Sequence, residues 1–126
     1  MQIYKTPLKE FKFLIEDFLK LHESEFLKNQ QLETSDLMLI LDEAAKLCEE
    51  TLLPLNQSGD SEGCKFDNGN VYAPKGFKDA YKLFADNGWQ SLKVKEEFGG
   101  QNLPYIMNML LDEMISSTNM SFGLYP

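Results

Sequence analysis

Hydrophobic residues recur at intervals of three and four along most of this chain, the spacing that places side chains on one face of an α-helix. The first stripe predicts a helix from Pro7 to about His22, and proline suits a first helical turn because its missing N–H needs no partner there. Between His22 and Glu33 the pattern loosens, which predicts a connection or a frayed helix. The stripe consists of Leu8, Phe11, Leu14, Ile15, Phe18 and Leu21.

The clearest stripe begins after Thr34 and Ser35, whose side-chain oxygens can cap the first turn of a helix. Proline lacks the N–H that a helix interior needs, so Pro54 is expected to end the regular hydrogen bonding of this second helix. The residues that follow, 56–60, have the composition of a turn. The buried face is predicted to comprise Leu37, Ile40, Leu41, Ala44, Leu47, Cys48, Thr51 and Leu52.

A short hairpin is predicted over residues 64–72. Its Asn68-Gly69 pair favours a tight turn because both central positions need positive φ. Arms this short are marginal alone, so we expect an excursion packed on helices and outside any larger sheet. The predicted fold class is therefore all-α, a helical bundle with this hairpin excursion.

A third helix is predicted from Phe77 to Asp86, ended by Asn87-Gly88, where a left-handed turn is easily formed. Trp89 is expected to dock into the core behind it. The buried face is predicted to consist of Phe77, Ala80, Tyr81 and Phe84.

A pair of glycines, Gly99-Gly100, precedes the last helical stripe. Glycine lets the backbone take positive φ or pass close to another group, and a helix N-terminus attracts anions. The pair therefore fits either a structural turn or a phosphate cradle, and the lack of a nucleotide-type glycine fingerprint favours the turn. We expect Asn102 to cap the next helix and Pro104 to begin it.

The last helix is predicted to break in the polar run 116–119, with Ser121 starting another element. The sequence stops at Pro126 on an apolar note, whereas natural C-termini usually fray in polar residues. We therefore expect the sequence to be cut partway into an element. The buried face of the helix is predicted to contain Tyr105, Met107, Leu110, Leu111, Met114 and Ile115.

Charge narrows the possible partners of this chain. Its 126 residues are one domain's length or part of a larger protein, and they carry a formal net charge of −8. All 12 basic residues are lysines, so the arginine forks that read phosphates and guanine are missing, which weighs against nucleic acid. No apolar run reaches the roughly 20 residues of a membrane span. With no apolar signal segment at the N-terminus, a soluble cytoplasmic protein is expected.

Metal and thiol chemistry receive little support. Cys48 and Cys64 do not make a disulfide framework in a chain of this length, and two reduced thiols are the expected state. His22 is the single histidine and lacks partners at zinc-ligand spacing, so no metal site is predicted.

Five motifs occur in one order along the chain: "LLPLNQSGDSEGCKF", "PKGFKDAY", "NGW", "EEFGGQNLP" and "DEMISSTNMSFGLYP". Together they resemble the N-terminal helical domain of the acyl-CoA dehydrogenase family. The preceding "YKTPLKEFKFLIEDFL" resembles the branch with an extra N-terminal segment, that of 3-methylthiopropanoyl-CoA dehydrogenase-like enzymes. Lys95 and Asn102 stand where the family usually has proline and glycine; asparagine tolerates positive φ, so the turn is expected to be kept.

The resemblance implies a domain division and a chemistry. Residues 1–33 would be the N-terminal extension and its connection, and residues 34–126 the N-terminal helical domain, followed after Pro126 by an FAD-binding β-domain. Such flavoproteins of fatty acid metabolism desaturate an acyl-CoA at the α–β bond. Their catalytic glutamate and most flavin contacts lie in later domains, so no catalytic or cofactor-binding residue is expected here. The acidic residues Glu96, Glu97, Asp112 and Glu113 are expected to be solvated.

The resemblance also implies a wall for the acyl pocket. Phe122 and Gly123 fall at pocket-lining positions of the family, with Pro126 one turn further and Met120 as a neighbour. A bulky Phe122 would shorten the pocket and suit a short or medium acyl group. The alternative, that Phe122 and Met120 are ordinary core, has the same composition and stays open.

Three functions are considered. The first is part of an FAD-dependent dehydrogenase that takes acyl-CoA and passes electrons to an acceptor. Because this chain has a net charge of −8, the CoA phosphates are expected to bind to other domains. The second is a stand-alone helical interaction module that kept the fold without the chemistry. The third, an unrelated bundle, is disfavoured by the ordered motifs. Apolar faces left uncovered would promote a homo-oligomer.

Overall fold

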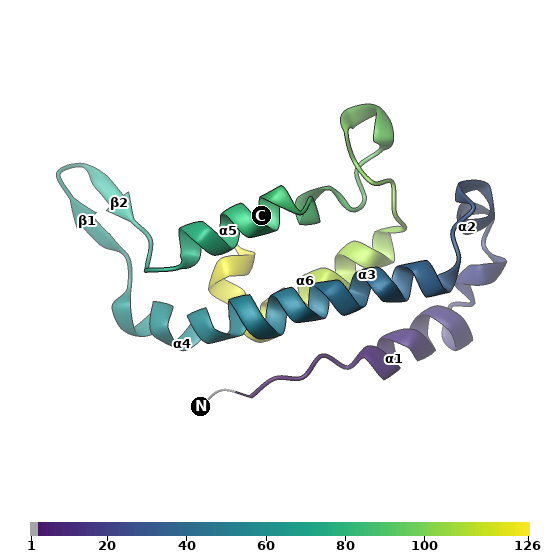
Figure 1. Ribbon diagram of the computed structural model, residues 1–126, viewed down its shortest axis with the longest axis horizontal. Coiled ribbons are helices and arrows are strands. Elements are labelled where there is room, and N and C mark those ends of the chain that lie inside the picture. Colours follow the sequence, from purple (N-terminus) through teal and green to yellow (C-terminus); the bar gives the residue numbers. More distant parts are fainter. Residues whose placement is uncertain (1–2) are drawn as a thin grey trace.

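The computed structural model of the protein describes residues 3–126 and is built almost entirely from helices. Figure 1 shows a long central helix running the length of the molecule, with helix α1 below it, helix α5 above it and helix α6 alongside. Two short strands form a hairpin at one end. This confirms the all-α fold class with a hairpin excursion.

The central helix passes straight through Pro54. It consists of α3 (Thr34–Lys46), the π-helical segment η3 (Leu47–Leu52) and α4 (Leu53–Glu62). The predictions of an end at Pro54 and a turn at 56–60 are therefore wrong. The π-helical segment η3 ends just before Pro54, so this residue falls in the first turn of α4, where its missing N–H is tolerated. The helix therefore changes type at this point and does not end.

The start of α3 also differs from the prediction. Its N-cap residue is Glu33, whose backbone N–H donates to the Asp36 carboxylate at 2.9 Å. Thr34 and Ser35 are the first helical residues. A carboxylate in the first turn satisfies a free donor and lies near the positive end of the helix dipole.

The N-terminal region folds as several short helices. Helix α1 (Leu8–Phe13) continues as the π-helical η1 (Leu14–Phe18), and a 3₁₀ turn η2 (Leu21–Glu23) leads to α2 (Glu25–Gln30). The first helix thus ends at Phe18, four residues before the predicted end, because Lys20 turns into the left-handed region with φ 49°. The loosely patterned stretch contains a real helix, α2, capped by Ser24.

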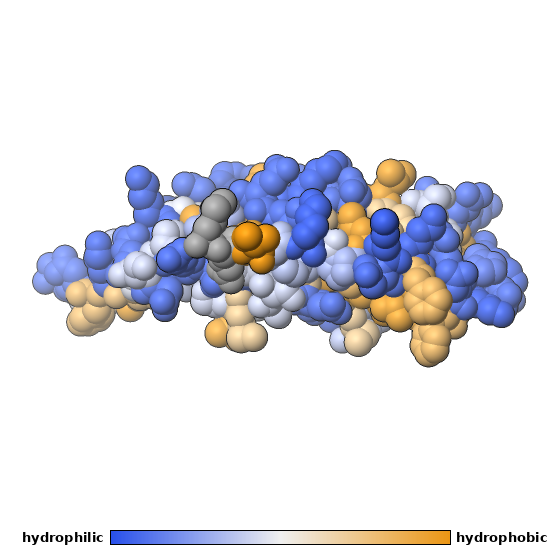
Figure 2. All heavy atoms as spheres, turned by 90° about the horizontal axis from the view of Figure 1, so that it is seen from below, coloured by the Kyte–Doolittle hydropathy of each residue, from blue (hydrophilic) through white to orange (hydrophobic). Residues whose placement is uncertain are grey.

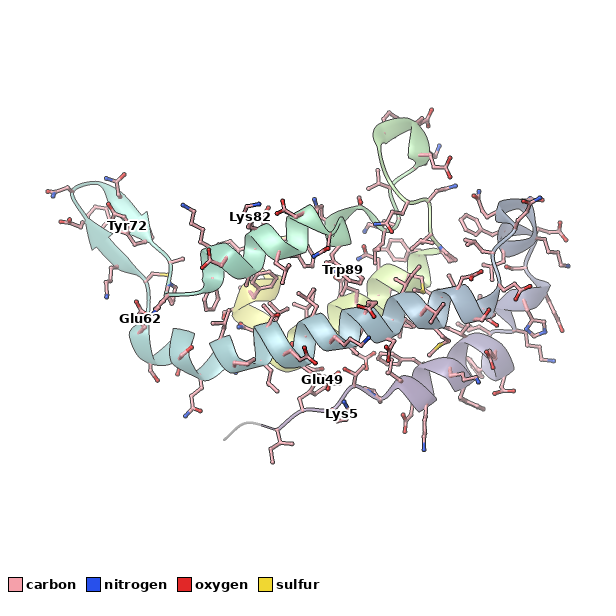
Figure 3. All side chains as sticks on the ribbon, viewed as in Figure 1. Lys5, Glu49, Glu62, Tyr72, Lys82 and Trp89 are labelled. Atoms are coloured by element: carbon pink, nitrogen blue, oxygen red, sulfur yellow. The ribbon has the colours of Figure 1, made fainter. Side chains whose placement is uncertain are left out.

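The segment before α1 is tied to the central helix through one carboxylate. Glu49 accepts a hydrogen bond from Lys5 Nζ at 2.6 Å and another from the Thr6 backbone N–H at 2.9 Å, as Figure 3 shows for Lys5 and Glu49. Burial pushes the pKa of Glu49 up, but these hydrogen bonds outweigh it and hold the pKa below its ordinary value. Glu49 is therefore charged when it holds this segment in place.

The hairpin has the predicted register but not the predicted packing. Strands β1 (Lys65–Asp67) and β2 (Asn70–Tyr72) pair antiparallel around Asn68-Gly69. Every strand residue is exposed, and the hairpin projects from the end of the molecule (Figure 1). The expectation that it would pack on helices is wrong; besides its turn and ladder it has an ion pair between Lys65 and Glu62 at the end of α4, 3.6 Å apart.

Helix α5 (Phe77–Asp86) has the predicted bounds and is followed by the short 3₁₀ turns η4 (Trp89–Ser91) and η5 (Glu96–Phe98). The last helix, α6 (Tyr105–Gly123), packs along α3, η3 and α4. One core joins these helices with α1, η1 and α2. Some residues of the predicted apolar faces lie outside it: the side chains of Phe18, Tyr81 and Tyr105 are 70%, 47% and 62% exposed.

Candidate functional site

The loop before α6 is shaped by both of its glycines. Gly99 has φ 79°, a conformation that side chains rarely adopt. Gly100 has no room for a side chain, because a Cβ there would lie 2.0 Å from the Val94 carbonyl oxygen. Asn102 takes φ 50° and does not cap the helix; Pro104 occupies the N-cap position of α6 instead.

The same loop uses its own backbone donors. The N–H groups of Gly99 and Gly100 donate to the carbonyls of Glu96 and Lys95, and those of Gln101 and Asn102 donate to Ser91 and Val94. All four distances lie between 2.8 and 3.1 Å. A phosphate cradle needs such N–H groups to be free. The loop in this conformation is therefore a turn that positions α6, and it does not fit a phosphate.

Helix α6 contains one sharp kink, at Asn119. Its backbone has φ −157° and ψ 83°, while the helix continues on both sides. The predicted break is therefore narrower than the run 116–119, and Asn119, not Ser121, begins the final turn. The Asn119 side-chain oxygen accepts hydrogen bonds from the Phe122 N–H at 3.0 Å and the Ser121 hydroxyl at 2.8 Å.

Asn119 also joins two distant parts of the chain. Its amide nitrogen donates to the carbonyl oxygen of Leu52 at 3.1 Å, across 67 residues of sequence. The side chain is completely buried. The sequence analysis did not identify this residue. The available signal was that Asn119 stands four residues after Ile115 and so falls on the apolar face of the helix. A buried amide on such a face needs hydrogen bonds to compensate for the loss of water.

The final turn orients the four candidate wall residues differently. Phe122 is 1% exposed and packs edge-on against Phe84, with ring centroids 5.7 Å apart. Met120 points to solvent with 64% exposure, so it is not part of the core. Gly123 and Pro126 are exposed but line a surface hollow of about 300 Å³ together with Trp89.

Phe122 lines a different hollow from Gly123 and Pro126. On the α5 side, a nearly all-apolar hollow of about 210 Å³ is lined by Phe77, Tyr81, Phe122 and Tyr125. The hollow of Gly123 and Pro126 is more polar and includes Lys93 and Asp112. The structure therefore brings Phe122 to an apolar wall and separates it from the other candidates.

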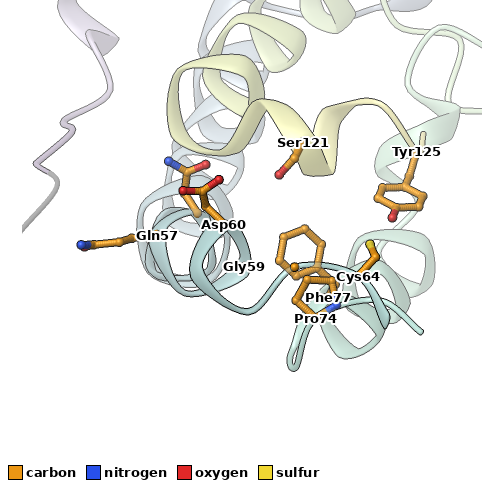
Figure 4. A pocket seen from close by; sticks show the side chains of 10 residues that line it. Gln57, Gly59, Asp60, Cys64, Pro74, Phe77, Ser121 and Tyr125 are labelled. Atoms are coloured by element: carbon orange, nitrogen blue, oxygen red, sulfur yellow. The ribbon is translucent and has the colours of Figure 1, made fainter. Parts of the chain in front are cut away.

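A third and larger hollow lies where α4, the hairpin, α5 and the last turn meet. It has a volume of about 780 Å³, and Figure 4 shows Asp60, Phe77, Ser121 and Tyr125 around it. Its lining mixes polar and apolar side chains, including the exposed thiol of Cys64. Sequence reasoning did not predict this hollow, because residues 56–60 were expected to form a turn.

The charged side chains at these hollows, among them Asp60, Lys93 and Asp112, are exposed. Within residues 3–126, no three His, Cys, Asp or Glu side chains are grouped as a metal site. The side chains of Glu96, Glu97, Asp112 and Glu113 are exposed. Burial raises the pKa of the Cys48 thiol to about 12, so this cysteine is a protonated core residue.

Comparison with known proteins identifies the class of domain. Residues 34–126 match the family model described as the acyl-CoA dehydrogenase N-terminal domain. The chain therefore belongs to the acyl-CoA dehydrogenase family and carries its N-terminal domain. Along the part of the chain that the structure describes, no helix is long and apolar enough to cross a bilayer.

Two relatives extend the comparison. The chain is 38% identical over 124 residues to 3-methylmercaptopropionyl-CoA dehydrogenase of Ruegeria pomeroyi (strain ATCC 700808 / DSM 15171 / DSS-3), covering 98% of this chain and 21% of the relative. It is 31% identical over 91 residues to butyryl-CoA dehydrogenase of Syntrophomonas wolfei subsp. wolfei (strain DSM 2245B / Goettingen), covering 68% of this chain and 15% of that protein. The chain thus spans about a fifth or less of the length of these curated relatives.

Proposed function

We propose that this chain is the N-terminal part of an FAD-dependent acyl-CoA dehydrogenase, in which it walls the acyl pocket. The observation that carries the proposal is the family match over residues 34–126. In the proposed reaction the acyl-CoA loses an α-proton to a carboxylate and a β-hydride to FAD, giving the α,β-unsaturated thioester. FAD, when bound by the parent protein, would supply the hydride acceptor, and an electron-transfer partner would receive the electrons.

This chain's own contribution is proposed to be structural. The N–H groups of residues 99–102 already donate within the chain and are not free for a pyrophosphate. FAD and the catalytic carboxylate are assigned to later parts of the parent protein. With a net charge of −8, the chain is a poor site for CoA phosphates, which are also assigned elsewhere. Exposed apolar side chains such as Phe13 and Phe18 support a homo-oligomer. Figure 2 shows that hydrophobic side chains reach the surface in several places on one face.

The wall is proposed to act through Phe122. This side chain belongs to an almost entirely apolar hollow beside α5 and is held there by Phe84. An acyl chain needs such a lining, and a fixed aromatic ring limits how far the chain can extend. We therefore propose a substrate with a short or medium acyl group, and within that range one nearer in length to butyryl than to octanoyl.

Replacement of Phe122 by alanine in the whole protein tests this function. The parent enzyme is expected to oxidise butyryl-CoA in preference to octanoyl-CoA, and Phe122→Ala to shift kcat/KM toward octanoyl-CoA on the order of tenfold, the discrimination that about one methylene carries in an apolar pocket. Leu124→Ala is the matched control, since it shortens an exposed side chain beside the same turn that lines neither hollow, and it is expected to leave the preference unchanged. An unchanged chain-length preference in Phe122→Ala contradicts the wall assignment.

A further inference from the structure

We propose that Asn119 is a positioning residue that sets the depth of the acyl pocket by fixing the turn that carries Phe122. The inference rests on the proposed function, because it concerns how the wall of that pocket is held. The inference goes beyond the proposed function because it assigns the position of the wall to the buried Asn119 amide, which touches no substrate. Three hydrogen bonds that meet at the Asn119 side chain support it.

First, Asn119 anchors the turn to the central helix. Its amide nitrogen donates to the Leu52 carbonyl at 3.1 Å. Leu52 is the last residue of η3, where the backbone changes from π-helical to α-helical just before Pro54. The anchor therefore joins α6 to the most irregular point of the central helix, a kind of position that often has a functional role.

Second, Asn119 caps the turn that follows it. The side-chain oxygen accepts hydrogen bonds from the Phe122 N–H and the Ser121 hydroxyl. Because Phe122 follows the kink by three residues, this cap fixes the direction in which its ring leaves the backbone. Both ends of one planar amide thus connect Leu52 to Phe122.

Third, the kink is confined to Asn119. The preceding residue, Thr118, donates its hydroxyl back to the carbonyls of Met114 and Ile115 at 2.8 and 3.2 Å, within its own helix. Thr118 is almost as buried as Asn119, and its side chain also contacts the Cys48 thiol of η3, but its hydroxyl donates within its own helix and not to the turn that carries Phe122. It is therefore a matched control for loss of a buried hydrogen bond that does not position the turn.

Without the anchor, the turn is free to move away from the central helix, and Phe122 moves with it. The pocket then deepens, and longer acyl chains gain more than shorter ones. Truncation of the amide is therefore expected to raise the octanoyl-CoA to butyryl-CoA ratio of kcat/KM, in the same direction as Phe122→Ala.

The test measures that ratio in the whole protein for Asn119→Ala, Phe122→Ala and the double variant. Asn119→Ala is expected to raise the ratio on the order of tenfold, and to raise it no further when Phe122 is already alanine, because coupled residues are not additive. Asn119→Ser keeps an oxygen that can cap the turn but is too short to reach Leu52. It is expected to shift the ratio as well and gives a milder variant if the alanine protein does not fold.

The controls separate the possible outcomes. Thr118→Val is expected to lower stability but leave the ratio unchanged. If Asn119→Ser folds and lowers kcat/KM equally for both substrates, Asn119 is a structural residue and the inference is wrong. If the shifts of Asn119→Ala and Phe122→Ala add fully, Asn119 does not act through Phe122. A flavin-loaded wild-type protein that oxidises neither acyl-CoA overturns the proposed function and, with it, this inference.

Discussion

At the scale of single residues, burial separates the two cysteines. Cys48 is completely buried in the core, and burial raises its pKa to about 12. Cys64 is exposed beside the largest hollow. The reactive species of a thiol is its thiolate, so burial and the raised pKa of Cys48 both disfavour reaction at Cys48, whereas reagents can reach Cys64.

Alkylation should therefore distinguish the two thiols. In the native protein at roughly pH 8, just below the ordinary thiol pKa, iodoacetamide is expected to modify Cys64 and leave Cys48 unmodified, as measured by peptide mass spectrometry. Unfolding in urea is expected to expose both. Cys64→Ser is the control, because it should abolish native labelling. Equal labelling rates for the two cysteines in the native protein would mean that the core around Cys48 is not packed as described.

At the scale of elements, the loop 95–104 determines where α6 begins. Its two glycines are needed for different reasons: Gly99 for a positive φ, and Gly100 for contact with the Val94 carbonyl. Four successive backbone hydrogen bonds close the loop on residues 91–96. An error in this loop would displace the whole helix that ends in the proposed wall.

Alanine at each glycine should reveal this difference. Gly99→Ala is expected to cost about 1 kcal/mol, the cost of a left-handed backbone for an L-residue, because open space surrounds the site. Gly100→Ala is expected to cost about 3 kcal/mol, because the new Cβ meets backbone that cannot move aside. Urea unfolding followed by circular dichroism measures both changes. Similar costs at the two positions would contradict the close approach to Val94.

The hydrophobic periodicity predicted helices correctly where local sequence determines their bounds. It failed where contacts between residues distant in sequence determine the structure. Helix α5 was found with its bounds, since its apolar spacing and its glycine at the end are local signals. Continuation through Pro54 was missed, because the π-helical segment that absorbs the proline has no simple sequence pattern. The hairpin turn was recognised locally, but its lack of packing was not.

The candidate site was predictable only in part for the same reason. Resemblance to a family pointed to residues 120–126, yet it could not separate Phe122 from Gly123 and Pro126, which line different hollows. The hydrogen bond from Asn119 to Leu52 spans 67 residues. No local pattern encodes such a contact, so only the folded chain shows it.

At the scale of the whole molecule, the chain is an acidic helical unit with one core and several exposed apolar side chains. The hollow that contains Phe122 and the larger one beside it lie near α5 and the last turn of α6, at the end of the molecule that carries the hairpin. Its matched residues cover 21% and 15% of the lengths of the two curated relatives. These features agree with a wall that other parts of a larger enzyme complete.

The most direct test of this account is the intact mass and absorption spectrum of the protein purified from its natural source. If the chain is part of an FAD-dependent dehydrogenase, the mass is expected to be several times the 14.5 kDa of this chain, and the spectrum to be that of bound flavin. Bleaching of that spectrum by an acyl-CoA would identify the substrate class in the same sample. A colourless protein of 14.5 kDa would contradict the account and leave a stand-alone helical module with the family's fold.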